Sequence, residues 1–309
     1  MQKTFKTLKE QIVILKNKGL KIEDEVQVEE ILLRENYFFI NGYRHLFLNS
    51  GAEKGFIPGS TFKELYALFN FDRQIRNIIF KNILIIENNI KSICSYQLSK
   101  KYGYREHNYL NPMNFNTDSD KVRQVSDLLR KMKRQIRVNG GQHSATSHYI
   151  QNYGYVPMWI VVKVLSFGIV SELYSVMKEE DQDEIASIFK VDADNLMVYL
   201  PILANFRNLC AHEDILYNHR TQRSINDTRY HNLLGIASEE GEYVCGKNDL
   251  FALVIILKQL LYEDAFTLFL NEVNYEVDIL TGKLASINIE KVLNAIGFPT
   301  NFEEIARMD

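Results

Sequence analysis

The stretch of sequence that decides the fold is residues 61–101, TFKELYALFNFDRQIRNIIFKNILIIENNIKSICSYQLSKK. Its apolar side chains return to one side at helical spacing. They include Phe71, Ile75, Ile83, Ile90 and Leu98. This pattern predicts one long helix that ends at Tyr102-Gly103 and forms the first helix of a bundle. The charged residues Arg73, Arg76, Lys81, Glu87 and Lys91 lie off the apolar stripe.

Before this helix, the chain carries the signals of a small helical unit. Thr7 and Glu10 have the spacing of a capping box, and Gly19 supplies a helix stop. A second helix is expected over residues 24–34. The aromatic residues that follow would form a small core or stack unpaired bases. They are Tyr37, Phe38, Phe39, Tyr43 and Phe47. Because residues 49–60 read as a glycine-rich loop, we assign residues 1–58 to an N-terminal helical extension.

After the long helix, a strongly basic helix is expected to begin at Asp118 or Ser119. Its cations outnumber its single acid, Asp127, so the helix would either follow a phosphate backbone or present a solvated charged face. The candidate RNA-binding residues here are Arg130, Lys131, Lys133, Arg134 and Arg137. Pro157 then begins a nearly all-round apolar helix that reaches Met177 and is expected to lie deep in the bundle.

The remaining elements complete an all-α class. A helix beginning near Asp194 contains Pro201, and a short hairpin is expected around Gly241. A long helix follows from Asp249 to about Phe269, and a short helical segment closes the chain. We therefore expect a helical core over residues 59–275 and a C-terminal helical tail over residues 276–309.

Length, net charge and cysteine content limit the functions and partners that the chain can have. The chain has 309 residues and a net charge of −3, so contact with nucleic acid requires a local basic surface. Three cysteines without a C-x-x-C pair predict reduced thiols in a cytoplasm. No segment resembles a signal peptide or a membrane span, and we expect neither a membrane nor a cofactor as partner.

The candidate catalytic stretch is NFRNLCAH, residues 205–212. On a helix, Asn205, Asn208 and His212 share one polar face, whereas Arg207 lies about 140° from His212. A kink at Pro201, or a second copy of the chain, would bring the two together. An imidazole titrates near neutral pH and an arginine fork fits a phosphate, which suits cleavage of RNA through its own 2′-hydroxyl. The alternative is a core helix with one surface Arg and one satisfied His.

Several motifs resemble those of a known family. Arg207-Asn208-Leu209-Cys210-Ala211-His212 is similar to the R-(N/H/D)-x(3–5)-H motif of HEPN ribonucleases. The following Leu216-Tyr217-Asn218 resembles the L-Y-N of the Abi_2 (AbiD/AbiF-like) abortive-infection proteins. Asn36 to Tyr43 is similar to the N-Y-(Y/F)-R-(L/I)-S-G-Y of that family, and Val156 to Gly168 is similar to its V-P-x-W…L-S-F-G. Two departures, Phe39 and Ile215, replace positive charges that the family often carries.

The resemblance implies a HEPN-type helical bundle and a metal-independent endoribonuclease of an antiphage, toxin-like system. His212 would be the general acid or base, Arg207 the phosphate stabiliser and Asn208 an orienting group. Tyr217 and Asn218 would support the helix geometry or the substrate. Such nucleases pair two motifs, so a homodimer is implied. The other possibility is an RNA-binding or RNA-sensing module that is held by a partner noncoding RNA and has no catalysis of its own.

Two other site chemistries fit the spacing poorly. Glu213, His219 and His231 lie near His212 in the sequence, but they lack the spacing of a metal-hydrolase motif. Cys210 and His212 are two residues apart, and such residues point to different sides of a helix, which disfavours a cysteine nucleophile.

Overall fold

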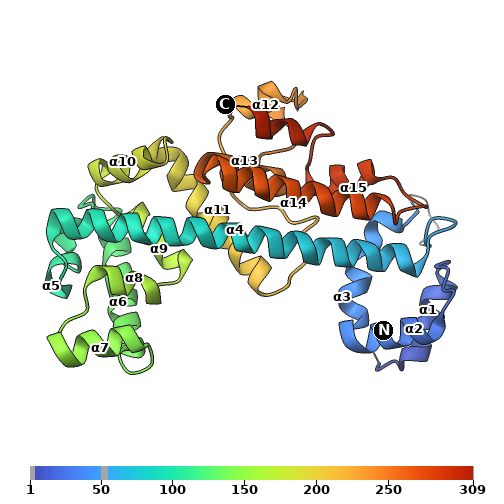
Figure 1. Ribbon diagram of the computed structural model, residues 1–309, viewed down its shortest axis with the longest axis horizontal. Helices are drawn as coiled ribbons and strands as arrows, with labels where there is room; N and C mark the ends of the chain where they lie inside the picture. Colours follow the sequence, from blue (N-terminus) through green and yellow to red (C-terminus); the bar gives the residue numbers. More distant parts are fainter. Residues whose placement is uncertain (1–3, 50–54, 309) are drawn as a thin grey trace.

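The computed structural model describes residues 4–49 and 55–308 of an elongated all-α protein. Helix α4, Phe62–Tyr102, runs along the length of the molecule, and elements from the N-terminal, middle and C-terminal parts of the chain pack against it (Figure 1). The single long helix predicted from residues 61–101 is therefore confirmed. Thr61 and Glu64 form its capping box, and Gly103, with φ 98°, ends it. In the described part of the chain, no helix has both the length and the apolar character that crossing a membrane requires.

The N-terminal elements sit at one end of α4 (Figure 1). The capping box of Thr7 and Glu10 is present, and both predicted helices are confirmed. Of the loop expected over residues 49–60, residues 50–54, with Gly51, lie outside the described residues. The elements are α1 (Leu8–Asn17), α2 (Glu25–Glu35), α3 (Tyr37–Asn41) and the 3₁₀ helix η1 (Gly42–Phe47).

The middle of the chain forms the opposite end of the molecule and then returns along α4. The predicted apolar helix after Pro157 is wrong as one element, because Ser166 caps a new helix and divides it in two. The basic helix begins at Val122 rather than at Asp118 or Ser119, which form a preceding turn. The elements are α5 (Glu106–Tyr109), η2 (Pro112–Asn114), α6 (Val122–Asn139), α7 (Ser144–Tyr153), α8 (Met158–Val164), α9 (Phe167–Ser175), α10 (Glu179–Ile188) and α11 (Ala193–Ala211).

The C-terminal helices cover another side of α4. The expected hairpin around Gly241 is confirmed as a two-residue pairing. The helix expected from Asp249 to Phe269 is divided at Leu261, and its second half continues to Thr281, so the expected boundary at residue 275 lies inside a helix. The elements are α12 (Arg229–Leu233), β1 (Ser238–Glu239), β2 (Glu242–Tyr243), α13 (Leu250–Leu260), α14 (Glu263–Thr281), α15 (Ile289–Ile296) and η3 (Phe302–Arg307).

Because helices cover α4 on several sides, some charged residues off its apolar stripe are buried as pairs. Arg76 is buried with Asp72, and Lys91 is buried with Glu87. By contrast, Lys81 remains half exposed and pairs with Glu272 of α14 at 2.7 Å. A charge left without its partner at a buried position would destabilise the fold, so each buried cation on α4 needs its acidic neighbour.

Candidate functional site

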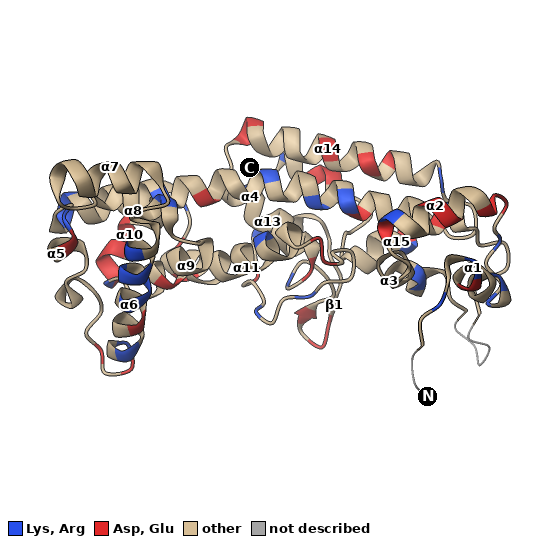
Figure 2. Ribbon diagram, turned by 90° about the horizontal axis from the view of Figure 1, so that it is seen from below, with Lys and Arg blue, Asp and Glu red and all other residues tan. Residues whose placement is uncertain are grey.

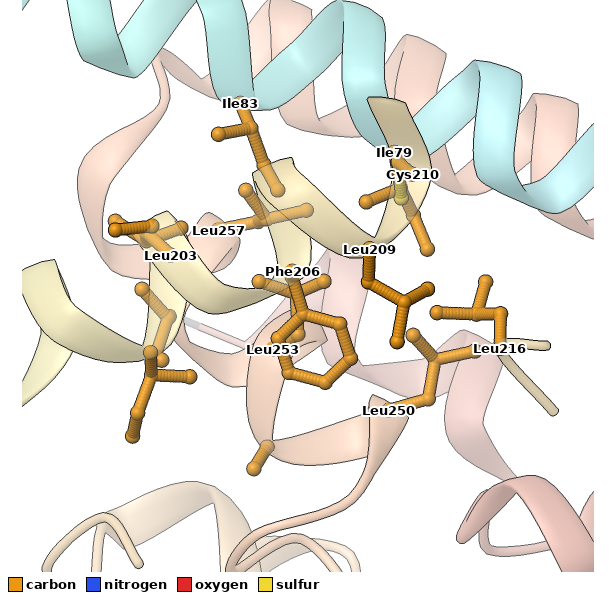
Figure 3. Close-up of a cluster of buried hydrophobic side chains, with 14 of the residues drawn as sticks. Ile79, Ile83, Leu203, Phe206, Leu209, Cys210, Leu216, Leu250, Leu253 and Leu257 are labelled. Carbon is orange, nitrogen blue, oxygen red and sulfur yellow. The ribbon is translucent and has the colours of Figure 1, made fainter. Parts of the chain in front are cut away.

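Helix α11 carries the candidate catalytic stretch across the middle of α4. Its apolar side chains Leu203, Phe206, Leu209 and Cys210 are buried against α4 and α13 (Figure 3). Figure 3 shows them facing Ile79 and Ile83 from α4 and Leu250, Leu253 and Leu257 from α13. The core therefore fixes the rotation of α11, and with it the directions in which its polar residues leave the helix.

Arg207 is held against α4. Its side chain is 33% exposed, and its Nε–H donates to Glu87 Oε2 at 3.4 Å. The guanidinium carbon lies 5.6 Å from the centre of the Phe80 ring, and Lys91 Nζ contacts the other oxygen of Glu87 at 2.6 Å. Nε is the one nitrogen of this guanidinium that donates to a residue within 4–49 or 55–308. The two terminal amino groups can therefore still bind a phosphate.

His212 and Asn208 face solvent. His212 caps the C-terminus of α11, and its backbone N–H donates to Asn208 O at 3.0 Å. Both side chains are exposed, and neither hydrogen-bonds to any other described residue. The alternative of a satisfied, buried histidine is thus wrong. Glu213 follows with φ 56°, a left-handed conformation that usually belongs to glycine. This conformation stops the helix after its cap residue, His212.

Pro201 does not bring Arg207 and His212 together. Helix α11 continues unbroken through Pro201 to Ala211. Both residues follow the proline, so a bend there would move them as one body. Within one chain, Arg207 lies along α4 and His212 leaves the helix about 140° away around its axis. The kink expected from the sequence is therefore wrong as a means of pairing them.

The segment after the motif is held by a buried polar network that the sequence did not reveal. Asp72 Oδ2 accepts hydrogen bonds from Tyr43 Oη at 2.6 Å and from the Leu216 N–H at 3.1 Å. Arg76 pairs with Asp72 and donates to Asp214 O at 3.2 Å. The i,i+4 spacing of Asp72 and Arg76 on α4 was the available signal. The network joins the N-terminal extension, α4 and the chain after His212.

Tyr217 and Asn218 differ in their surroundings. Tyr217 is buried, its ring centre lies 5.4 Å from that of Tyr43, and burial raises its pKa to about 12. Its hydroxyl has no hydrogen-bond partner among the described residues. Tyr217 therefore supports the local geometry and does not reach a substrate, whereas Asn218 is exposed. Gly42 packs close to Ile215, so the N-terminal motif abuts the same segment.

The histidines of the rejected metal-hydrolase motif have other partners. His219 Nε2 lies 2.7 Å from Asn205 Oδ1 on α11. His231 is fully buried, with Nδ1 at the Thr228 cap and Nε2 lying 3.0 Å from Gly246 O. Both side chains thus hold loops in place, His219 beside α11 and His231 on α12.

The basic helix α6 lies away from the motif. It packs with α8 and α9 at the end of the molecule opposite α1–α3, and Lys and Arg side chains follow its length (Figure 2). Arg130 pairs with Asp127 and Lys131 with Glu172, whereas Lys133, Arg134 and Arg137 are exposed without an acidic partner in the described part of the chain. These five cations border a groove of about 1130 Å³ whose floor includes Leu110, Val125 and Leu129.

The aromatic cluster of the N-terminal motif is divided. Tyr43 and Phe47 are buried, as the small-core alternative requires. Phe38 and Phe39 are exposed, and their ring centres lie 6.1 Å apart at an edge-to-face angle. The cluster is therefore a core on one side and an exposed pair on the other.

A comparison against protein families shows to which family the chain belongs. Residues 30–218 match the model of the Abi-like proteins, which is more than half of the chain. The chain belongs to the Abi-like protein family. Membership points to a role in abortive infection, a form of defence. The match in this Abi-like protein begins in α2 and ends at Asn218, so it includes the buried network and the whole candidate motif. Comparisons with curated proteins and with solved structures gave no match.

Proposed function

We propose that this Abi-like protein is a metal-independent endoribonuclease that acts as the toxic effector of an antiphage abortive-infection system. His212 serves as general acid or base, Arg207 stabilises the charge that develops on the phosphate, and Asn208 orients the substrate. The observation that supports the proposal is the exposure of His212 and Asn208 at the end of a rigidly packed helix whose Arg207 has two amino groups without a hydrogen-bond partner among the described residues.

The reaction needs no group beyond the RNA and these side chains. The ribose 2′-oxygen loses its proton and bonds to the adjacent phosphorus, and the bond from phosphorus to the 5′-oxygen breaks. The leaving 5′-oxygen takes up a proton. The products carry a 2′,3′-cyclic phosphate and a 5′-hydroxyl. An imidazole can perform each proton transfer near neutral pH, and an arginine fork contributes most where negative charge accumulates.

The site is composite in this proposal. Since Arg207 and His212 leave α11 in different directions, one phosphate would be contacted by Arg207 of one chain and His212 of a second copy. A twofold dimer would present the same pair of motifs twice, as closed symmetric interfaces do. Homodimerisation is therefore part of the proposed mechanism.

Substitution of the two residues tests the chemistry. We expect His212→Ala and Arg207→Ala to reduce cleavage of a labelled RNA at least ~100-fold, as loss of an acid–base or charge-stabilising group does. His107→Ala, which removes an exposed histidine on α5, is the matched control and should cleave normally. Mass spectrometry of the products identifies the cyclic phosphate, and a chelator should leave the rate unchanged. Normal cleavage by His212→Ala would end the proposal.

Mixing the two variants tests the composite site. A dimer with one Arg207→Ala chain and one His212→Ala chain retains one intact pair only if the pair is formed between chains. After exchange of subunits, activity should exceed that of either parent and reach up to about one quarter of the wild-type value, because half of the dimers carry one of two sites. A mixture no more active than its parents, with co-purification of differently tagged chains showing mixed dimers, would contradict pairing between chains.

RNA binding without catalysis is the second candidate function. It is favoured by the position of α6, which lies away from the motif (Figure 2) and carries Lys133, Arg134 and Arg137 without an acidic partner in the described part of the chain. In that case a partner noncoding RNA would be bound and not cut. Charge reversal at these three residues should weaken RNA binding, while His212→Ala should leave binding intact. Wild-type protein that binds RNA in a filter assay but does not cleave it would identify this second function.

A further inference from the structure

Five neighbouring aromatic side chains, three exposed and two half-buried, line the surface near the C-terminal end of α4. Ring centres of successive neighbours lie 5.3 Å apart for Tyr149–Tyr153, 6.4 Å for Tyr153–Tyr155, 5.8 Å for Tyr155–Tyr104 and 5.5 Å for Tyr104–Trp159. We call this surface the aromatic ladder. It combines residues from α7, the turn after α7, the turn after α4, and α8. The sequence pattern placed Trp159 in the core, and the structure places it outside.

The ladder exposes more aromatic surface than folding requires. Tyr153 is 57% exposed, Trp159 44% and Tyr104 39%. A contiguous exposed apolar patch usually marks a binding surface, whereas single exposed apolar residues carry no such meaning. The neighbouring Val156 and Met158 are fully buried, so the same short segment supplies both the core and the outward-facing ring.

Hydrogen bonds hold the ladder in place before any ligand arrives. The Val156 N–H donates to Glu106 Oε1 at 2.5 Å, and Tyr109 Oη donates to Val156 O at 2.7 Å. The Met158 N–H donates to Tyr104 O at 3.2 Å. These bonds join the turns that carry Tyr104, Tyr155 and Trp159. A preorganised surface of this kind loses little conformational entropy on binding.

The charges around the ladder favour an anionic ligand. The Arg105 guanidinium lies 4.8 Å from the centre of the Tyr155 ring and is exposed. The nearby acid, Glu106, is occupied by the Val156 N–H. Helix α6, with its unpaired Lys133, Arg134 and Arg137, packs against both α7 and α8. An aromatic surface bordered by cations suits a ligand that has both flat rings and phosphates.

We propose that the aromatic ladder is a stacking platform for unpaired bases of single-stranded RNA, with Arg105 and the cations of α6 on the phosphates. The inference rests on the proposed function, since it names the strand form of the RNA that the chain binds. Bases in a duplex are stacked on each other and paired, so their faces cannot reach the rings. Aromatic stacking accepts any base, so binding depends on strand form more than on sequence.

The single tryptophan of the chain provides a direct measurement, because Trp159 is a ladder residue. The full chain with His212→Ala, which removes the proposed acid–base group, is titrated with a 12-nucleotide RNA of mixed sequence that cannot pair with itself. We expect quenching of Trp159 fluorescence by the single strand and little quenching by the same RNA annealed to its complement. Equal quenching by the duplex would overturn the inference.

Variants then separate the ladder from other surfaces. Tyr153→Ala and Tyr155→Ala should each weaken single-strand binding at least ~5-fold, the lower end for loss of one stacking ring. Tyr275→Ala, on α14, removes an equally exposed tyrosine away from the ladder and should bind normally. Unchanged RNA affinity in the ladder variants would overturn the inference. So would a change in oligomer mass with RNA affinity preserved, since that identifies the ladder as an interface between proteins.

The two proposals fail differently. If ladder variants lose single-strand affinity but His212→Ala still degrades RNA, the ladder stands and the nuclease proposal falls. If His212→Ala abolishes cleavage but Trp159 is not quenched and the ladder variants bind normally, the nuclease stands and the ladder falls. Binding measured with His212→Ala and cleavage measured with the intact motif therefore give independent answers.

Discussion

The buried pair of Asp72 and Arg76 gives the sharpest prediction about what holds the motif in place. Replacing Arg76 with Met keeps much of the side-chain volume but removes the cation that faces Asp72. It also removes the donor to Asp214 O, just after the motif. The Asp72 carboxylate would keep two hydrogen bonds, from Tyr43 Oη and the Leu216 N–H. Breaking one side of a buried ion pair costs about 3–5 kcal/mol, because the other charge stays buried without its partner.

The loss should depend on pH. Burial is the largest influence on the Asp72 carboxyl and raises its pKa, while Arg76, Tyr43 and the backbone N–H of Leu216 oppose that rise. Arg76→Met removes the strongest opposition, so the pKa in the folded variant rises further. When a carboxyl has a higher pKa in the folded than in the unfolded state, the protein loses stability as pH increases above the unfolded-state pKa of about 3.9. The deficit of Arg76→Met relative to wild type should therefore shrink as pH falls from 8 to 5.

Urea denaturation followed by circular dichroism measures both effects. Arg34→Met is the matched control: Arg34 pairs with Glu30 at the same spacing but is 75% exposed, so its loss should cost about 0–1 kcal/mol. Asp72→Asn combined with Arg76→Met should recover part of the stability, because the amide stays neutral and still accepts hydrogen bonds. A loss below ~1 kcal/mol in Arg76→Met, or no recovery in the double variant, would refute this account of the network.

Four further predictions concern side chains of the motif and its surroundings. Tyr217→Phe removes a buried hydroxyl with no partner among described residues, so the free energy of unfolding should stay the same or rise. Tyr43→Phe removes a hydrogen-bond donor to Asp72, so the free energy of unfolding should fall by about 1.5–3 kcal/mol. Denaturation midpoints measure both changes. Glu213→Gly relieves φ 56° and should raise stability by about 1 kcal/mol in the same assay; a loss would show that the side chain matters. Glu87→Gln combined with Lys91→Met removes the anion that competes with RNA phosphate for Arg207 and leaves no buried cation unpaired, so KM should fall several-fold with kcat kept. A higher KM would show that Glu87 positions the arginine.

Local signals predicted much of the fold. The length of α4 was visible in an apolar stripe that has no internal breaker, and its end in Tyr102-Gly103. Gly241 identified the hairpin, since its φ of 87° suits a tight turn. In each case the deciding interaction lies within a few residues of the signal, so the sequence alone contains it.

The errors arose where apolar spacing continued across a break. The helix expected from Pro157 to Met177 is divided at Ser166, because both halves bury apolar residues in one core and the stripe does not show the change of direction. The division near Leu261 has the same cause. Trp159 followed the same stripe and was assigned to the core for that reason, although it lies on the exposed side of α8.

The site could be predicted only as residue types, because its contacts join distant parts of the chain. Asp72 reaches Leu216, and Arg207 reaches Glu87, and neither pairing has a local sequence signal. The spacing of Arg207 and His212 was visible. Their separate directions follow from that spacing, but which of the two lies against α4 depends on which face of α11 the core turns toward α4.

Helix α4 makes binding and cleavage separable. Three positions along this helix carry different roles. Asp72 belongs to the buried network, Glu87 is the partner of Arg207, and Tyr102 is the helix end next to the aromatic ladder. At about 1.5 Å of rise per residue, each of these intervals spans about 22 Å along the helix. A strand held on the ladder thus lies well away from His212 of the same chain. Loss of stacking should therefore raise KM and leave kcat unchanged. Loss of Arg76, which fixes the segment after His212, should instead lower kcat, so that saturating RNA does not restore the rate.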